Sequence, residues 1–260
     1  MSIQNSQQAW FNTSVGQYLQ AKEQVLYDQA VVDLFGFNAL QMGELPLDLL
    51  RNSRIPNRYR SSTYKVAALN NHLYCEDDFL PLADMSLDLL LLPHRLEFSE
   101  RPHQVLREAA RVMIPEGHLL ISGFNSISLW GVKAGLKKIF ARQSAFPWNG
   151  QFIALTRMKD WLALLGFEIV SVNMCCHVPP FEQATWQERS AFMDKFGEKC
   201  CAVFGGVYFI VAKKRVPGMT SLKPNWKKPV LATTLITRPT SSRPAQFRPT
   251  DLNTSNKNLK

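Results

Sequence analysis

The chain has 260 residues, of which 46% are hydrophobic and 20% are charged, so it can bury the core of one large globular domain. Its net charge is +9, and its longest apolar run, at residues 89–92, is far shorter than the roughly 20 residues that cross a bilayer. The first residues lack the basic and apolar segments of a signal peptide. These features argue against a membrane-spanning or exported protein, and we expect a cytoplasmic location with no membrane span.

The cysteines indicate neither a disulfide framework nor a metal centre. There are five, and four of them form two adjacent pairs, Cys175-Cys176 and Cys200-Cys201. An odd count argues against paired disulfides. Adjacent cysteines also lack the short loop that lets two thiolates reach one zinc ion. We therefore predict free thiols and no metal.

The positive charge is concentrated at the C-terminal end. Residues 216–260 contain eight Lys and Arg residues and one Asp, so they carry +7 and leave +2 for residues 1–215. The same segment has six prolines and little apolar periodicity, which is typical of a disordered tail. We predict a folded domain over residues 1–215 and a basic tail over 216–260. The tail either makes weak, nonspecific contact with a polyanion such as RNA or DNA, or serves only as a solubilising appendage.

The first half of the domain begins with a helix and continues with short strands. Apolar residues at helical spacing predict an amphipathic helix over about 16–35. A strand is predicted at 39–42, and the polar, basic segment 51–63 is predicted to be a loop. Further strands are predicted at 64–69, 72–75 and 87–92. The last of these is continuously apolar apart from Asp88, as in a parallel strand that is covered on both faces.

The second half alternates helices with strands. Ser99 is the expected cap of a helix whose apolar stripe includes Val105, Leu106 and Ala109, with Glu108 facing solvent. A strand at 118–122, a helix from Thr156 to Gly166, and strands at 167–172 and 207–212 complete the pattern. Strands that alternate with helices predict an α/β fold with a doubly wound, mostly parallel sheet. Ligands of such sheets bind beyond the carboxyl ends of the strands.

Residues 80–122 then resemble a known family. Leu80-Pro81-Leu82-Ala83-Asp84-Met85-Ser86-Leu87-Asp88-Leu89 is similar to the LPF-x-D-x-S-FD-x-V signature of class I S-adenosylmethionine-dependent methyltransferases (methyltransferase type 11 domain). His94-Arg95-Leu96-Glu97 resembles the H-x-L-E that follows it, and residues 106–122 resemble the L-R-E-x-x-R-V-L-x-P-G-G-x-L-x-I run. Residues 121–128 are shared with an uncharacterised bacterial subfamily. The resemblance implies a Rossmann-like sheet of seven strands and S-adenosylmethionine as cofactor.

Cofactor-site residues follow from this resemblance, position by position. The family has an acid and a G-x-G-x-G turn after the first strand, whereas here only Gly43 is kept and Leu45 and Leu47 replace the later glycines. The acid expected after the second strand is absent, which leaves Asn70 as the substitute. The resemblance implies a cofactor site made of residues that each follow a strand: Gly43, Glu44, Asn70, Glu76, Asp77, Asp78, Pro93 and His94.

Two functions remain open at this point. One is an S-adenosylmethionine-dependent methyltransferase of unknown acceptor, in which His94 is the candidate to take a proton from the substrate because an imidazole ordinarily titrates near neutral pH. The other is a catalytically inactive binding or regulatory protein on the same fold, with the cofactor cleft closed by Leu45 and Leu47. The sequence does not identify the acceptor or the oligomeric state.

Overall fold

The structure is a computed structural model that describes residues 9–43, 47–63, 72–140, 146–178 and 205–215. All of these residues fall in the first of two compact units of the chain, Met1–Gly218. The predicted basic tail at 216–260 and the predicted strand at 64–69 lie outside the described residues.

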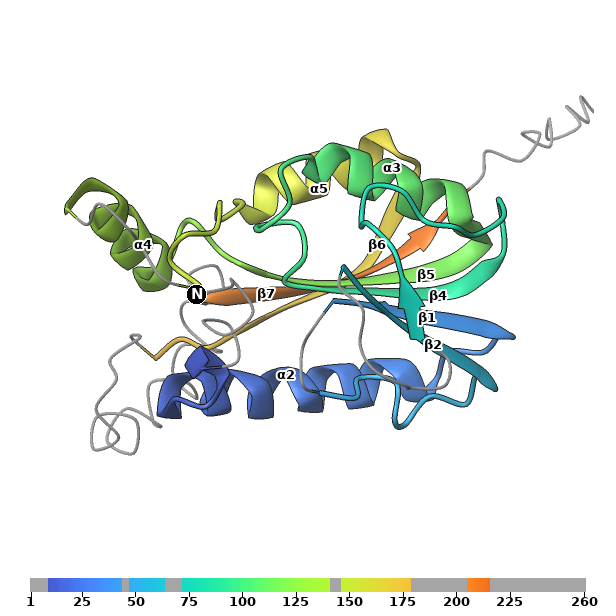
Figure 1. Ribbon diagram of the computed structural model, residues 1–260, viewed down its shortest axis with the longest axis horizontal. Helices are drawn as coiled ribbons and strands as arrows, with labels where there is room; N and C mark the ends of the chain where they lie inside the picture. Colours follow the sequence, from blue (N-terminus) through green and yellow to red (C-terminus); the bar gives the residue numbers. More distant parts are fainter. Residues whose placement is uncertain (1–8, 44–46, 64–71, 141–145, 179–204, 216–260) are drawn as a thin grey trace, which may run out of the picture. The chain divides into compact units, whose positions relative to one another are not determined.

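A seven-stranded sheet forms the centre of this unit (Figure 1). Its strand order is β3-β2-β1-β4-β5-β7-β6, and only β7 runs antiparallel to its neighbours. The strands are β1 (Asn38–Met42), β2 (Asn57–Ser62), β3 (His72–Tyr74), β4 (Leu87–Pro93), β5 (Met113–Phe124), β6 (Phe167–Cys175) and β7 (Val207–Lys214). The strand order reverses between β1 and β4, so this is the switch point at which such sheets bind ligands. The prediction of a mostly parallel, doubly wound sheet is confirmed.

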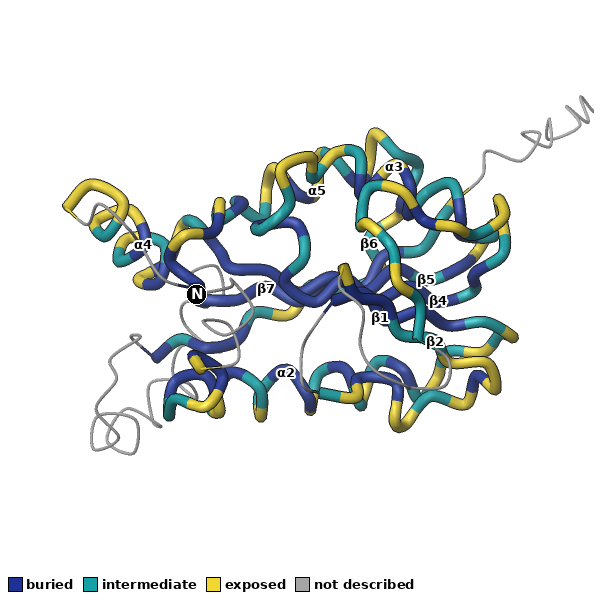
Figure 2. The backbone as a smooth tube through the Cα atoms, in the orientation of Figure 1, coloured by how far each residue is buried: buried dark blue, intermediate teal, exposed yellow. Residues whose placement is uncertain are grey.

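Helices cover both faces of the sheet, which explains why its central strand β4 is apolar apart from Asp88. Helix α2 (Ser14–Val32) lies on one face, and α3 (Pro102–Val112) and α5 (Leu155–Leu164) lie on the other (Figure 1). Every residue of β4 except Asp88 is buried (Figure 2). Helix α4 (Leu129–Phe140) follows β5 and stands beside the end of the sheet.

The second strand differs from the sequence prediction. Residues 57–62, predicted as part of a loop, form β2 and pair in parallel with β1 from Asn38 opposite Asn57 to Met42 opposite Ser61. The polar sequence of β2 hid it, because its first residues are exposed and only Ser61 and Ser62 are buried. The residues that follow the second strand are therefore Thr63 and its successors, not Asn70.

The start of α3 also differs from the prediction. Arg101 is the N-cap residue, and its side chain makes no capping hydrogen bond. The Ser99 hydroxyl accepts a hydrogen bond from the Arg101 N–H just ahead of the helix. Glu108, predicted to face solvent, is buried because it binds Arg111 and accepts a hydrogen bond from the Leu80 N–H. The apolar stripe of α3 is buried as predicted.

Among the described helices, none is long and apolar enough to cross a membrane.

Asp88 links the beginnings of two neighbouring strands. Its Oδ2 atom accepts hydrogen bonds from the backbone N–H groups of Phe37 and Asn38, each at 2.9 Å. We predict that Asp88→Ala lowers the free energy of unfolding by about 1 to 3 kcal/mol, because both donors lose their partner. Urea denaturation checks this, with Asp160→Ala on the exposed side of α5 as the control. Equal unfolding midpoints for the two variants would contradict the role assigned to Asp88.

Candidate functional site

The carboxyl ends of the parallel strands bring together the residues that the sequence singled out. Gly43 follows β1, Pro93 ends β4 with His94 next in the chain, and residues 75–79 follow β3. Because these strands are parallel neighbours, their carboxyl ends share one edge of the sheet. Glu44 and Asn70, the two remaining predicted residues, lie outside the described residues.

Gly43 occupies a position that only glycine fits without strain. Its φ angle is +102°, a backbone conformation that side chains disfavour. A Cβ atom at this position would lie 2.6 Å from the Cδ atom of Arg95. The bare backbone at the end of β1 therefore faces the side chain of Arg95, two residues beyond β4.

Arg95 connects two parts of the predicted cofactor site. Its guanidinium forms an ion pair with Asp77, and its Nε–H donates to Asp77 Oδ2 at 2.9 Å. Both side chains are only 13% exposed. Arg95 thus extends from the end of β4, past Gly43, to the acidic segment after β3. Sequence reasoning missed this role, because Arg95 is one basic residue within a family motif.

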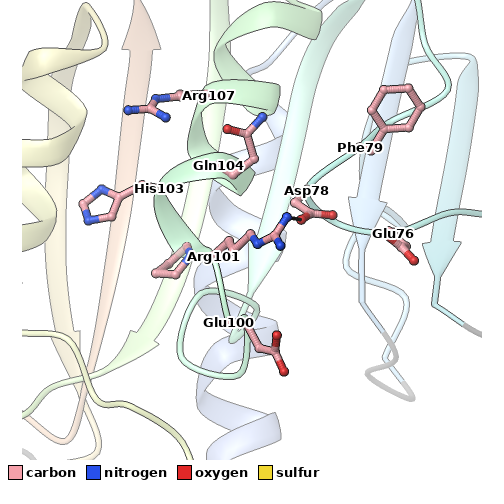
Figure 3. Close-up of a pocket in the computed structure, with 9 residues that line it drawn as sticks. Glu76, Asp78, Phe79, Glu100, Arg101, His103, Gln104 and Arg107 are labelled. Atoms are coloured by element: carbon pink, nitrogen blue, oxygen red, sulfur yellow. Dashed lines mark ion pairs between the residues drawn. The ribbon is translucent and has the colours of Figure 1, made fainter.

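The three acids after β3 are divided between two surroundings. Asp77 binds Arg95, whereas Glu76 and Asp78 line a surface pocket of about 620 Å³ next to the first turn of α3. Asp78 pairs there with Arg101 across 3.7 Å (Figure 3). Of the three, Asp77 is therefore the acid held closest to the switch point, through Arg95.

His94 lies in a buried cluster with two carboxylates. Its Nε2 atom is 2.8 Å from Glu23 Oε1, and its Nδ1 atom is 3.3 Å from Glu97 Oε1. All three side chains are 1% exposed. Glu23 comes from α2, so this cluster joins the N-terminal helix to the ends of β4 and β5. Glu97 also accepts a hydrogen bond from the Phe124 N–H at 2.6 Å.

The two carboxylates change the protonation of the imidazole. Burial alone lowers the pKa of His94, but the Glu23 charge and the hydrogen bonds to Glu23 and Glu97 outweigh burial and raise this pKa to about 10. The second carboxylate oxygens, Glu23 Oε2 and Glu97 Oε2, are buried without a hydrogen-bond partner. Tyr208 Oη is also buried and unpartnered, and burial followed by the Glu97 charge raises its pKa well above the usual value.

Aromatic side chains surround this cluster. The His94 ring lies 4.2 Å from that of Phe124, which in turn stacks on Trp130 at 5.8 Å and on Phe152 at 4.8 Å. Trp130, Phe146 and Trp148 are almost fully buried in the core. Leu47, which replaces a family glycine, packs against the same core.

The described residues contain no group of three His, Cys, Asp or Glu side chains that is placed to hold a metal ion.

Comparisons with known proteins identify related sequences. A family model described as a methyltransferase domain matches residues 57–121. The uncharacterized protein YafS of Escherichia coli K12 is 31% identical over 187 residues, which cover 72% of each chain.

Solved structures share the fold at low identity. An S-adenosylmethionine-dependent methyltransferase of Thermotoga maritima, described as a possible histamine N-methyltransferase, has a TM-score of 0.55 at 18% identity and covers 81% of this chain and 96% of its own. The [4+2]-cyclase SpnF has a TM-score of 0.53 at 16% identity, with 75% and 80% covered. The chain belongs to the class I S-adenosylmethionine-dependent methyltransferase superfamily and, within it, to the family of the E. coli protein YafS.

Proposed function

We propose that this protein is an S-adenosylmethionine-dependent methyltransferase whose cofactor binds at the switch point between β1 and β4. The observation that carries the proposal is Gly43, a bare backbone position at the end of β1 with a positive φ angle, in a sheet with the strand order 3-2-1-4-5-7-6. When bound, S-adenosylmethionine supplies a methyl group on a positively charged sulfonium, so the protein has mainly to bind and orient.

The residues present fit this cofactor once one side chain moves. Gly43 offers open backbone, and Asp77 offers a carboxylate after β3, one residue beyond Glu76, which the resemblance puts in the place of the acid at the adenine end. Arg95 blocks both Gly43 and Asp77 in the described conformation, because it packs against Gly43 and pairs with Asp77. Ser61 and Ser62 end the second strand and Thr63 follows it, so these three residues offer no carboxylate for the ribose. We assign cofactor contacts to Gly43, Asp77, Pro93 and the backbone of His94, with Glu76 and Asp78 at the outer edge.

The buried cluster favours a ligand with a cationic centre. The cluster holds two carboxyl groups for a single imidazole, and one oxygen of each carboxyl group has no hydrogen-bond partner. Buried polar atoms without a partner are costly, and a nearby sulfonium or ammonium group would offset that cost.

In this arrangement His94 acts as a positioning residue and not as the general base that its ordinary pKa suggested. Both ring nitrogens already bind carboxylates, and the raised pKa keeps the ring protonated at neutral pH.

An inactive binding protein is the alternative, and the Arg95–Asp77 pair is the observation that favours it. Calorimetric titration with S-adenosylmethionine and S-adenosylhomocysteine separates the two functions. We expect binding of both compounds to the full chain. An absence of heat at millimolar ligand, for the full chain and for Arg95→Ala alike, would leave the inactive protein as the better description.

The position of Arg95 leads to a prediction on affinity. We predict that Arg95→Ala binds S-adenosylhomocysteine about tenfold more tightly than the unchanged protein, because the ligand no longer has to displace a charged hydrogen bond. Arg157→Ala, on the exposed side of α5, serves as the control and should leave the affinity unchanged. Weaker binding by Arg95→Ala would show instead that Arg95 contacts the ligand.

The pKa of His94 leads to a prediction on stability. A pKa raised from 6.5 to about 10 on folding gives a stabilisation that is complete below about pH 6.5 and is lost as the pH rises toward 10. Glu23→Gln removes one of the two carboxylates, so we predict a loss of about 3 to 5 kcal/mol at pH 6 and a weaker dependence on pH between 6 and 10. Urea denaturation across this range measures both effects, with the exposed Glu100→Gln as the control. An unchanged slope in Glu23→Gln would contradict the assignment.

A further inference from the structure

Helix α4 has an apolar face that the other described residues leave uncovered. Trp130 and Ala134 are its buried side chains and attach it to the core. The exposed apolar residues recur at helical spacing and are each at least half exposed: Leu129 53%, Val132 58%, Leu136 50%, Ile139 75% and Phe140 83%. At 100° per residue these five fall within one stripe, on the side of the helix opposite to Trp130 and Ala134. Figure 2 shows the exposed side of α4 where the helix projects beyond the sheet.

Lysines lie beside this stripe and behind it. On a helical wheel Lys133 lies next to one edge of the stripe, and Lys137 lies between Lys133 and the buried Trp130. Lys138 lies on the side opposite to the stripe, beside Ala134, and is exposed. Lys133 and Lys137 also lie over the Trp148 ring, at 4.7 and 5.2 Å from its centroid. The helix therefore carries positive charge along one edge of the stripe and on its far side, and it has no acidic side chain.

The excess of positive charge extends beyond α4 in the sequence. Between Glu116 and Asp160 there are six Lys and Arg residues and no Asp or Glu. A nucleic acid would use the positive charge but not a stripe of five apolar side chains. A cationic helix with one apolar face matches a bilayer surface, where anionic headgroups meet the lysines and the apolar side chains enter the boundary with the acyl chains.

We propose that α4 docks this protein onto an anionic membrane surface, with Leu129, Val132, Leu136, Ile139 and Phe140 facing the lipid. The helix lies in the plane of the interface and is too short to span the bilayer, which is consistent with the absence of a spanning helix among the described residues. The docking is independent of the cofactor site and holds whether or not the protein transfers a methyl group.

Vesicle flotation with the full chain tests this proposal. We expect binding to vesicles of phosphatidylcholine with phosphatidylglycerol, weaker binding in high salt, and little binding to phosphatidylcholine alone. The double variant Ile139→Ser/Phe140→Ser should bind about tenfold more weakly or worse, because it loses the two most exposed apolar side chains of the stripe. The variant Lys138→Glu should weaken binding to the anionic vesicles specifically.

The matched control is Phe37→Ser/Leu164→Ser, which removes two side chains that are 74% and 84% exposed outside α4. It should bind vesicles like the unchanged protein. Since the basic residues 216–260 are present in every variant, a difference between the two double variants reports on α4 alone. Equal binding by both double variants would overturn the proposal. A failure of the unchanged protein to bind anionic vesicles would also overturn it, as would an oligomer in sedimentation that Ile139→Ser/Phe140→Ser dissociates, since the face would then bind a second copy.

Discussion

The edge of the sheet at which ligands bind depends on one set of contacts. These are the contacts of the His94 imidazole with the carboxylates of Glu23 and Glu97. They tie α2, near the start of the described chain, to strands that follow some 70 residues later, and they do so through polar side chains that are 1% exposed. Apolar side chains of similar volume would often hold such elements together at lower cost. A buried ion cluster with unpartnered oxygens is therefore poorly explained by stability alone, and its place at the carboxyl ends of β4 and β5 gives it a functional explanation.

The same edge of the sheet explains why a single retained glycine is enough to locate the site. In the family resemblance, three glycines after the first strand let the cofactor approach. Here Leu47 is partly buried and packs against the core, while Gly43 keeps a positive φ angle at the end of β1, beside the switch point. The long side chain of Arg95 fills the space next to it. The flexible side chain of Arg95 can move out of that space. Leu47 packs against the core instead, so its replacement of a family glycine does not by itself close the space beside Gly43. This removes part of the objection that the missing glycines raise against cofactor binding.

The sequence predicted the central part of the fold because several signals agreed there. Continuous apolarity marked β4, the stripe of α3 gave its buried face, and Gly166 marked the end of α5, where its φ angle is +80°. It failed at β2, whose polar residues pair by backbone hydrogen bonds that periodicity does not report. It also failed at Glu108, which is buried with partners on another loop and on the next turn of its own helix. The burial of His94 depends in the same way on Glu23, a partner far away in the sequence. The resemblance proposed Gly43 and Asp77 as cofactor-site residues, whereas the position of Arg95 between them follows only from the folded geometry.

Charge is distributed unevenly along the chain around α4. Helix α4, which follows β5, carries three lysines and no acid, and the stacked rings of Phe124 and Trp130 connect its attachment point to the His94 cluster. Trp130 and Ala134 hold the helix on the core, so the exposed apolar stripe is left on its outer side, with Lys133 beside one edge. Apolar side chains that enter the boundary with the acyl chains, and a lysine at the level of the headgroups, are what an anionic bilayer surface requires.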